Sequence, residues 1–592
     1  MDDLVIGMAG AGGDGIVSIG ESLVSSAAAD GYFAIMTKSF GSQIRGGESS
    51  CRLRLSTRPL YNPGGTLDIA VALNWEDFMR FGAELPVGGQ TVVIYEAKTG
   101  VDPARLPLEG VTPAESLAVP IADLAKAHGG DRSKNMVVLG LIAGWFGIGR
   151  ESVLAGMRRK LSKKGEEVLA AAEKAFSAGQ TYAAAHPLRK PRVLAPATQP
   201  AGSLLLADGN DICAMGAIAA GCRFFGGYPI TPSTEIMQRL GRDIWQFGGA
   251  VLQAEDEIAG IGAAVGASYA GVKSMTATSG PGMSLKTEVL GLATIAELPL
   301  VLVNVQRGGP STGLPTKSEQ SDLFQGGFSG HGDGLRPGLA VTGVADTFAT
   351  TVGAFNIAEE YQTPVVLLSD QDIAQRKESF APFDPTAIPL VNRLVPTERD
   401  LQNYRRFLFT DSGVSPVSHP GMAGGSYLAS GIEHSESGAP TSSGQMHERM
   451  LAKRFRKLDP LRKRRDLFEL VGDAKAPLGL IAWGSIAGVC RESIALAQAE
   501  GIRAKLLIPR LLFPVAEEIY REFLGSLRAG LVVEQSYQGQ LYRLLRMYID
   551  VPDKVVSLTR PGANPFRPEE IVDRLRAFSL ALQHSHQPPV SE

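Results

Sequence analysis

The sequence predicts an α/β protein with three domains, each built around a parallel β-sheet. Its 592 residues correspond to three or four domains at about 150 residues each. Short, uniformly apolar runs recur along the chain, and such runs are typical of strands buried on both faces of a parallel sheet. Many of the 69 glycines follow these runs, where an α/β chain turns from strand to helix.

Changes in composition place the domain boundaries. The stretch HPLRKPRVLAPATQPAG is rich in proline and has no periodicity, as expected of a linker, whereas a later polar, irregular stretch is expected to be a connector. The runs LGLIAWGS, RAKLLIPR, GLVVEQS and DKVVSL predict four strands in the last domain. The predicted division is a first domain over 1–185, a linker over 186–202, a second domain over 203–396, a connector over 397–475, a last domain over 476–583 and a disordered tail over 584–592.

Charge and cysteine content argue against several classes of protein. A net charge of −3 provides no basic field for nucleic acid. Cys51, Cys213, Cys222 and Cys490 lie far apart, so they predict neither disulfides nor a zinc or iron–sulfur ligand set, and the eight histidines show no metal or triad spacing. Because Met1 is followed by no basic region and no apolar run approaches 18 residues, we expect a reduced, cytoplasmic protein with no membrane segment.

The N-terminal stretch LVIGMAGAGGDG predicts a strand, a glycine loop and a helix over 16–30, and LDIAVAL and QTVVIY predict buried parallel strands. The loop from Gly10 to Gly15 fits the dinucleotide fingerprint G-x-G-x-x-G. The ribose-binding acid expected about 20 residues on is not clear, since Asp30-Gly31 is better explained as a turn. GDG also opens a thiamine diphosphate metal motif, but the Asn-Asn pair of that motif is missing.

A loop arginine precedes a strand in the stretch FGSQIRGGESSCRLRLS. Alternation from Cys51 to Leu55 predicts a strand with one solvent-facing side. Arg45 stands before two glycines, on a flexible loop suited to binding an anion through the guanidinium group. A solvated loop arginine is the alternative.

The segment GGYPITPSTE, Gly226 to Glu235, predicts a strand end, a tight loop and a helix start. Proline fixes φ and suits the first turn of a helix, so Thr231 is the predicted N-cap and Pro232 the first helical residue. The two prolines would then hold the Thr231 hydroxyl at the mouth of the loop. Capping alone is the alternative role.

The strongest pattern joins an acidic helix start to a glycine turn. Glu257 opens a helix of small residues over 259–266, and Thr278 follows 21 residues later inside TSGPG, at the end of a predicted strand. Glu257 either complements the helix dipole or is partly desolvated, with a raised pKa, and shares a proton with a ligand nitrogen.

Arg307 ends an apolar strand at the position where ligands bind in open α/β sheets. Its guanidinium is suited to binding a carboxylate, with Ser311, Thr312 and Thr316 as hydroxyl neighbours. A structural ion pair with Asp322 or Glu319 is the alternative. Farther along, the basic stretch over 448–469 predicts a solvated helix with a connector, or a docking surface for a partner.

Together, the motifs GYPITPST, AEDEIAGIGAAVGA, TSGPG, VQRGGPSTGLPTKSEQSDL and VVEQSYQGQL resemble the alpha subunits of 2-oxoacid:ferredoxin oxidoreductases, in particular those that act on 2-oxoglutarate. GAGGDGI and FGSQIRGGESSC resemble the gamma domain of the same family, fused in front. The resemblance implies a gamma-like domain, a thiamine diphosphate pyrimidine-binding domain and a transketolase C-terminal-like domain. It also implies that the Gly10 to Gly15 loop is structural or faces another subunit.

The resemblance also implies residue roles. Glu257 would hydrogen-bond the aminopyrimidine of thiamine diphosphate as the catalytic residue, and Arg307 would bind the substrate carboxylate. The remaining expected sites are substrate-binding Thr231 and Thr316, cofactor-binding Pro229, Thr278, Ser279 and Gly280, and Arg45 as a contact of coenzyme A.

The expected partner is a beta subunit, in an α2β2 assembly, that brings the diphosphate site, Mg²⁺ and a [4Fe-4S] cluster. The expected reaction is oxidation of 2-oxoglutarate with coenzyme A and ferredoxin. Pyruvate and branched-chain oxoacids are alternative substrates. Two rival functions, an acetolactate synthase-type enzyme and a dinucleotide-binding regulatory protein, leave parts of the pattern unexplained, because the first requires a diphosphate motif in this chain and the second uses neither Glu257 nor Arg307.

Overall fold

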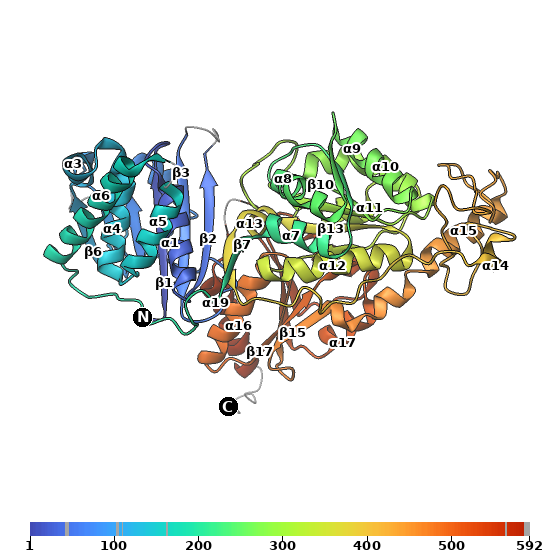
Figure 1. Ribbon diagram of the computed structural model, residues 1–592. Coiled ribbons are helices and arrows are strands. Elements are labelled where there is room, and N and C mark those ends of the chain that lie inside the picture. Colours follow the sequence, from blue (N-terminus) through green and yellow to red (C-terminus); the bar gives the residue numbers. More distant parts are fainter. Residues whose placement is uncertain (42–46, 102–105, 109, 162–163, 563–564, 585–592) are drawn as a thin grey trace, which may run out of the picture. The chain divides into compact units, whose positions relative to one another are not determined.

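The computed structural model describes the whole chain except residues 42–46, 102–105, 109, 162–163, 563–564 and 585–592. The described residues form two compact units. Unit 1 comprises Met1–Asp208 and Gln375–Phe383, and unit 2 comprises Gly209–Ala374 and Asp384–Glu592. Figure 1 shows both units as strands covered by helices, which confirms the α/β class.

Unit 1 contains an eight-stranded sheet in the order β6-β5-β4-β1-β3-β2-β14-β7. Strands β6, β5, β4 and β1 are parallel, as predicted. The pairs β1–β3, β3–β2, β2–β14 and β14–β7 are antiparallel. Only residues 41–48 connect β2 to β3, too few for the crossover of about a dozen residues that a parallel pair needs. The strands are β1 (Asp3–Gly10), β2 (Phe33–Phe40), β3 (Ser49–Ser56), β4 (Ile69–Ala72), β5 (Val92–Glu96), β6 (Glu115–Val119), β7 (Leu205–Asp208) and β14 (Lys377–Phe380).

The helices of unit 1 cover an apolar core on this sheet. Gly15 precedes the first of them with a positive φ of 76°, so the predicted strand, glycine loop and helix are confirmed. The helices are α1 (Ile16–Ala29), α2 (Trp75–Arg80), α3 (Ile121–His128), α4 (Lys134–Phe146), α5 (Arg150–Leu161) and α6 (Glu166–Ala185).

Strand β3 differs from its prediction in the burial of its arginines. Arg52 and Arg54 are only 6% and 7% exposed, so the expected solvent-facing side is wrong. Arg54 forms an ion pair with Asp3, and Arg52 donates to the backbone oxygens of Gly65 and Glu84. The neighbouring loops therefore cover this face and satisfy both guanidinium groups with buried acceptors.

Unit 2 contains two sheets. The larger has the order β18-β12-β13-β11-β10-β8-β9, and the smaller has the order β15-β17-β16-β19-β20. The four strands predicted near the C-terminus are β16, β17, β19 and β20, all parallel, and β15 joins them antiparallel. The strands are β8 (Phe224–Gly227), β9 (Ala250–Gln253), β10 (Ser274–Thr278), β11 (Leu300–Gln306), β12 (Gly338–Ala340), β13 (Pro364–Asp370), β15 (Phe468–Gly472), β16 (Leu478–Ala482), β17 (Ala504–Pro509), β18 (Leu511–Phe513), β19 (Ala529–Glu534) and β20 (Val555–Thr559).

Helices follow most of these strands, and α9 and α10 pack side by side (Figure 1). The helices are α7 (Gly209–Ala219), α8 (Thr234–Asp243), α9 (Glu257–Tyr269), α10 (Gly280–Ile295), α11 (Leu323–Phe328), α12 (Val344–Tyr361), α13 (Gln371–Gln375), α14 (Glu398–Leu401), α15 (Gly444–Arg456), α16 (Ile486–Ala499), α17 (Glu517–Gly525), α18 (Gln540–Tyr548) and α19 (Pro568–His584). Between α14 and α15 the chain forms neither helix nor strand, as the irregular connector predicts.

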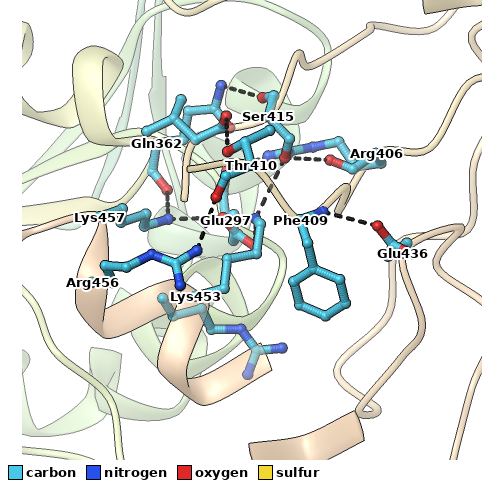
Figure 2. A network of polar contacts seen from close by, with 12 residues as sticks. Glu297, Gln362, Arg406, Phe409, Thr410, Ser415, Glu436, Lys453, Arg456 and Lys457 are labelled. Atoms are coloured by element: carbon cyan, nitrogen blue, oxygen red, sulfur yellow. Dashed lines mark hydrogen bonds and ion pairs between the residues drawn. The ribbon is translucent and has the colours of Figure 1, made fainter. Parts of the chain in front are cut away.

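A buried ionic cluster attaches this connector to the rest of unit 2. Glu297 lies two residues beyond the end of α10, and its carboxylate accepts hydrogen bonds from Lys453 Nζ at 2.6 and 2.8 Å and from Lys457 Nζ at 2.9 Å (Figure 2). Arg406 donates to the Glu297 backbone oxygen at 2.6 Å. Burial opposes ionisation of Glu297, but the three cations prevail and hold the pKa of its carboxyl well below the usual range.

The cluster corrects the prediction for the basic stretch. Lys453 and Lys457 are buried, so α15 is solvated on one face only. Spaced four residues apart, they lie on one face of the helical segment and point inward together. Burial lowers the pKa of Lys457 to about 8, and the carboxylate of Glu297 offsets part of that effect.

Replacement of the single anion is expected to destabilise unit 2. In Glu297→Gln, two ammonium groups stay buried without a counter-charge, which costs about 3–5 kcal/mol. The matched control is Glu436→Gln, because Glu436 belongs to the same network but is partly exposed. Urea unfolding followed by circular dichroism at pH 7 is expected to show a much larger loss of stability for Glu297→Gln than for Glu436→Gln.

The difference between wild type and Glu297→Gln also has an expected pH dependence. A carboxyl whose folded pKa is depressed stabilises the fold above its unfolded value and loses that contribution as the pH falls. The difference in the free energy of unfolding between wild type and variant should therefore narrow below about pH 4.5. Equal unfolding midpoints for both variants at pH 7 would contradict the role of the cluster.

Candidate active site

The predicted site residues of unit 2 gather at one edge of the larger sheet. Strands β9, β8, β10 and β11 are adjacent and parallel, so their carboxyl ends meet at the same edge. Ligands of open α/β sheets bind outside this edge. The residues that follow these strands are Glu257 after β9, Pro229 and Thr231 after β8, Thr278, Ser279 and Gly280 at the end of β10, and Arg307 after β11.

Glu257 is the first residue of α9, and its side chain is buried. The residue is 8% exposed, and the N-cap is its neighbour Asp256, whose carboxylate accepts from the Ala259 backbone N–H at 2.8 Å. Asp256 therefore caps the helix, and Glu257 is not needed for that. Among the described residues, none donates a hydrogen bond to the Glu257 carboxylate, so it is available to a ligand.

The TSGPG turn is shaped around Glu257. A Cβ atom on Gly282 would lie 2.2 Å from Thr278 Oγ1 and 2.9 Å from Glu257 Oε1, so only glycine allows the carboxylate to lie against the first turn of α10. Thr278 and Ser279 are fully buried. The hydroxyl of Ser279 has no partner among the described residues, which leaves a spare hydrogen-bonding atom in the TSGPG turn.

Arg307 is held by the backbone of the Thr231 loop. Its Nη1 donates to the Thr231 carbonyl oxygen at 2.6 Å. Burial lowers the pKa of Arg307, and the negative charge of Asp322 opposes this effect. Within the described part of the chain no acid lies close enough to Arg307 for an ion pair, so the structural pairing with Asp322 or Glu319 is not seen there. The guanidinium is therefore positioned but not neutralised.

A cavity of about 500 Å³ lies beside Arg307 and the start of α10. Its walls come from the start of α10, from the loop after β11 and from the loop before α18, and they include Gly280, Arg307, Ser311, Asp322, Tyr537 and Gln540. Gly280 lines the cavity at the start of α10, and Gly282, two residues later in the same turn, lies against the Glu257 side chain. Burial raises the pKa of Asp322 and of Glu319, a second acid in the wall.

The smaller sheet fixes the loop that follows Arg307. Gln320 donates from its backbone N–H to Gln535 O at 2.7 Å, accepts from Gln535 N–H at 2.8 Å and donates through Nε2 to Trp483 O at 2.6 Å. Gln540 donates to Ser321 O at 2.6 Å. Gln535 and Gln540 both belong to the motif VVEQSYQGQL, but neither was predicted to have a role.

The structure corrects the prediction for Thr231. Helix α8 begins at Thr234 with Ser233 as its N-cap, so Thr231 is not the cap and Pro232 is not the first helical residue. A turn intervenes, in which the Ser233 N–H donates to Ile230 O at 2.9 Å. Thr231 therefore contributes its backbone carbonyl to Arg307, and its hydroxyl is not engaged as a helix cap.

The other predicted residues lie at different distances from the cavity. Ser311 lines it, whereas Thr312 and Thr316 do not, and Pro229 is half-buried in the loop after β8. Arg45 lies outside the described residues. In the described ranges, no group of three His, Cys, Asp or Glu side chains is arranged to hold a metal ion. The helices found there are too short or too polar to cross a lipid bilayer.

Two family models match the chain. The model described as "Pyruvate flavodoxin/ferredoxin oxidoreductase, thiamine diP-bdg" matches residues 215–453, which contain Glu257 and Arg307. The model described as "Pyruvate ferredoxin/flavodoxin oxidoreductase" matches residues 5–182. The first match includes the whole sheet edge described above, and the second lies within unit 1.

Similar proteins match over most of their length. The 2-oxoglutarate oxidoreductase subunit KorA of Mycobacterium tuberculosis is 32% identical over 98% of this chain and 92% of its own. The 2-oxoglutarate synthase subunit KorA of Methanothermobacter marburgensis is 38% identical over 62% of this chain and 97% of its own. The solved 2-oxoglutarate:ferredoxin oxidoreductase from Magnetococcus marinus, with 2-oxoglutarate, coenzyme A and succinyl-CoA bound, is 38% identical, covers 98% of this chain and 99% of its own, and has a TM-score of 0.91. The chain therefore belongs to the family of 2-oxoacid:ferredoxin oxidoreductases, among its alpha subunits.

Proposed function

We propose that the chain is the alpha subunit of an enzyme that reversibly converts 2-oxoglutarate, coenzyme A and oxidised ferredoxin to succinyl-CoA, CO₂ and reduced ferredoxin. The similarity to the Magnetococcus marinus enzyme over nearly the whole chain is the observation that carries the proposal. That enzyme binds 2-oxoglutarate, coenzyme A and succinyl-CoA. Pyruvate and branched-chain oxoacids are the alternative substrates.

The residues at the sheet edge fit the aminopyrimidine end of thiamine diphosphate. The Glu257 carboxylate is buried and accepts no hydrogen bond from the described residues, and the hydroxyl of Ser279 in the TSGPG turn is spare. In the proposed site Glu257 holds a proton between its carboxylate and a pyrimidine nitrogen, and Pro229, Thr278, Ser279 and Gly280 surround the ring. When bound, thiamine diphosphate supplies the carbon nucleophile that attacks the oxoacid and accepts the electrons of decarboxylation.

Arg307 provides the substrate contact. The hydrogen bond from its Nη1 to Thr231 fixes the side chain. Its remaining N–H groups are available for a bidentate contact with a carboxylate. A small anionic molecule bound in the cavity beside it would lie next to the start of α10, the helix whose first turn lies against Glu257. Thr231 and Thr316 remain proposed hydrogen-bonding partners of the oxoacid. A carboxylate held in this way presents its neighbouring keto carbon in a fixed orientation.

The rest of the reaction is assigned to a partner. In the proposed α2β2 assembly the beta subunit brings the diphosphate site, Mg²⁺ and a [4Fe-4S] cluster that passes electrons to ferredoxin. Coenzyme A is the acyl acceptor, with Arg45 as a proposed phosphate contact. Arg307 is the cation that lines the described cavity, so a second substrate carboxylate would be bound by a residue elsewhere, which we place in the beta subunit.

Loss of the Glu257 carboxyl is expected to stop turnover. Glu257→Gln cannot share a proton with the pyrimidine, so dye reduction by the complex with the beta subunit should fall by about 10²-fold or more. Glu255→Gln is the matched control, because Glu255 is exposed two residues earlier. Full activity of a correctly folded Glu257→Gln complex would refute the cofactor contact.

Loss of the guanidinium is expected to affect one substrate selectively. Arg307→Ala should raise KM for the oxoacid by about 30-fold or more, since a buried charge contact of about 2 kcal/mol is removed. KM for coenzyme A should stay near the wild-type value. Arg307→Lys should recover part of the affinity for the oxoacid, because lysine restores the positive charge but not the bidentate geometry. An equal rise in both KM values would remove Arg307 from the oxoacid site.

A further inference from the structure

A buried lysine lies directly behind Glu257. Lys286 belongs to the second turn of α10, four residues after Gly282, so the two residues share the helix face that contacts Glu257. Its side chain is fully buried. Its Nζ donates to the Glu257 backbone oxygen at 3.0 Å and to Thr276 Oγ1 at 3.3 Å.

The hydrogen-bond partners of Lys286 carry no charge, so its ammonium group needs an anion nearby. Burial lowers the pKa of Lys286 to about 8, and the negative charges of Glu257 and, more weakly, Asp256 oppose that effect. Those two acids are the ionised groups that act on it from α9 and its N-cap, and its other contact, Thr276 of β10, does not titrate. Glu257 is therefore the principal counter-charge of Lys286.

The electrostatic effect works in both directions. A positive charge close to a carboxyl group favours its ionised form, and a buried carboxylate needs such a charge to persist away from water. The bond to the Glu257 carbonyl oxygen also joins the first turn of α9 to α10, which fixes the position of the Glu257 backbone. One side chain thus supplies both an anchor and a charge.

We propose that Lys286 is the positioning residue of the site: its buried ammonium anchors the first turn of α9 and sets the pH range in which Glu257 can share a proton with the cofactor pyrimidine. The proposal rests on the proposed function of Glu257. Lys286 itself touches neither the oxoacid cavity nor, in this arrangement, the cofactor. Its effect is transmitted through the position and the ionisation of Glu257.

The test is the affinity of thiamine diphosphate as a function of pH. The apo complex with the beta subunit is titrated with thiamine diphosphate and Mg²⁺ by calorimetry, from pH 5.5 to 8. Sharing of a proton weakens as the pH rises, and removal of the cation in Lys286→Met should move this fall in affinity upward by about one pH unit. Lys286→Gln keeps an N–H donor for the Glu257 carbonyl oxygen, so the same upward shift is expected in a variant with less packing change.

The matched control is Lys273→Met. Lys273 is a half-buried lysine of unit 2, and its Nζ donates to the backbone oxygens of Ala220 and Val391, not to Glu257. Its profile should superimpose on that of the wild type. A uniform loss of affinity at every pH in both Lys286 variants, without a shift of the profile, would show a merely structural role and overturn the proposal.

Glu257→Gln, titrated in the same way, separates this proposal from the function on which it rests. Loss of the pH dependence in Glu257→Gln supports the cofactor contact, whatever the Lys286 variants do. An unchanged profile in Glu257→Gln would refute the contact itself. A pH-dependent wild type with no shift in either Lys286 variant would refute only the role of Lys286.

Discussion

Parallel pairing of β9, β8, β10 and β11 is the constraint on which the site depends. Parallel strands end at one edge, so segments separated by up to 80 residues in the chain deliver their first loop residues to the same place. Four segments that are not adjacent in the sequence meet there: Glu257, the Thr231 loop, the TSGPG turn and Arg307. Glycine at position 282 then allows the acid to lie against the next helix. The remaining structure of unit 2 supports this edge.

Helix α10 connects the site to the buried ionic cluster around Glu297. Near its start, Lys286 contacts the Glu257 backbone, and beyond its end, Glu297 binds Lys453 and Lys457. Both ends therefore carry a buried charge that needs an opposite charge on another segment. The long connector before α15, which has little regular structure, gains a fixed position through the second of these contacts. The smaller sheet acts in a similar way on the Arg307 loop, through Gln320 and Gln535.

The sequence was informative where a pattern has one physical cause. The strands predicted before Thr278 and Arg307 are β10 and β11, and both are buried along their whole length. Motif spacing placed Glu257 and Arg307 after strands, and the parallel topology brought them to one edge. The same reasoning assigned no role to Lys286, because nothing in the local sequence marks a lysine as buried.

The errors have a common origin in contacts between distant segments. Alternation in β3 indicated a solvent-facing side, but Arg54 forms an ion pair with Asp3 of the neighbouring strand β1 and is buried. The basic stretch before β15 indicated a solvated helix, but Lys453 and Lys457 bind an acid more than 150 residues away. Thr231 met the rules for a helix cap, but a turn moves the start of α8 from Pro232 to Thr234. In each case tertiary partners outweigh a sound local preference.

The central claim is that this chain supplies half of a thiamine diphosphate-dependent oxidation of 2-oxoglutarate. The most direct test is anaerobic dye reduction by the chain co-purified with its beta subunit, with each component omitted in turn. Reduction that requires both subunits, 2-oxoglutarate, coenzyme A and thiamine diphosphate is the predicted result. No reduction with 2-oxoglutarate, pyruvate or a branched-chain oxoacid, from an intact and cofactor-loaded complex, would contradict it.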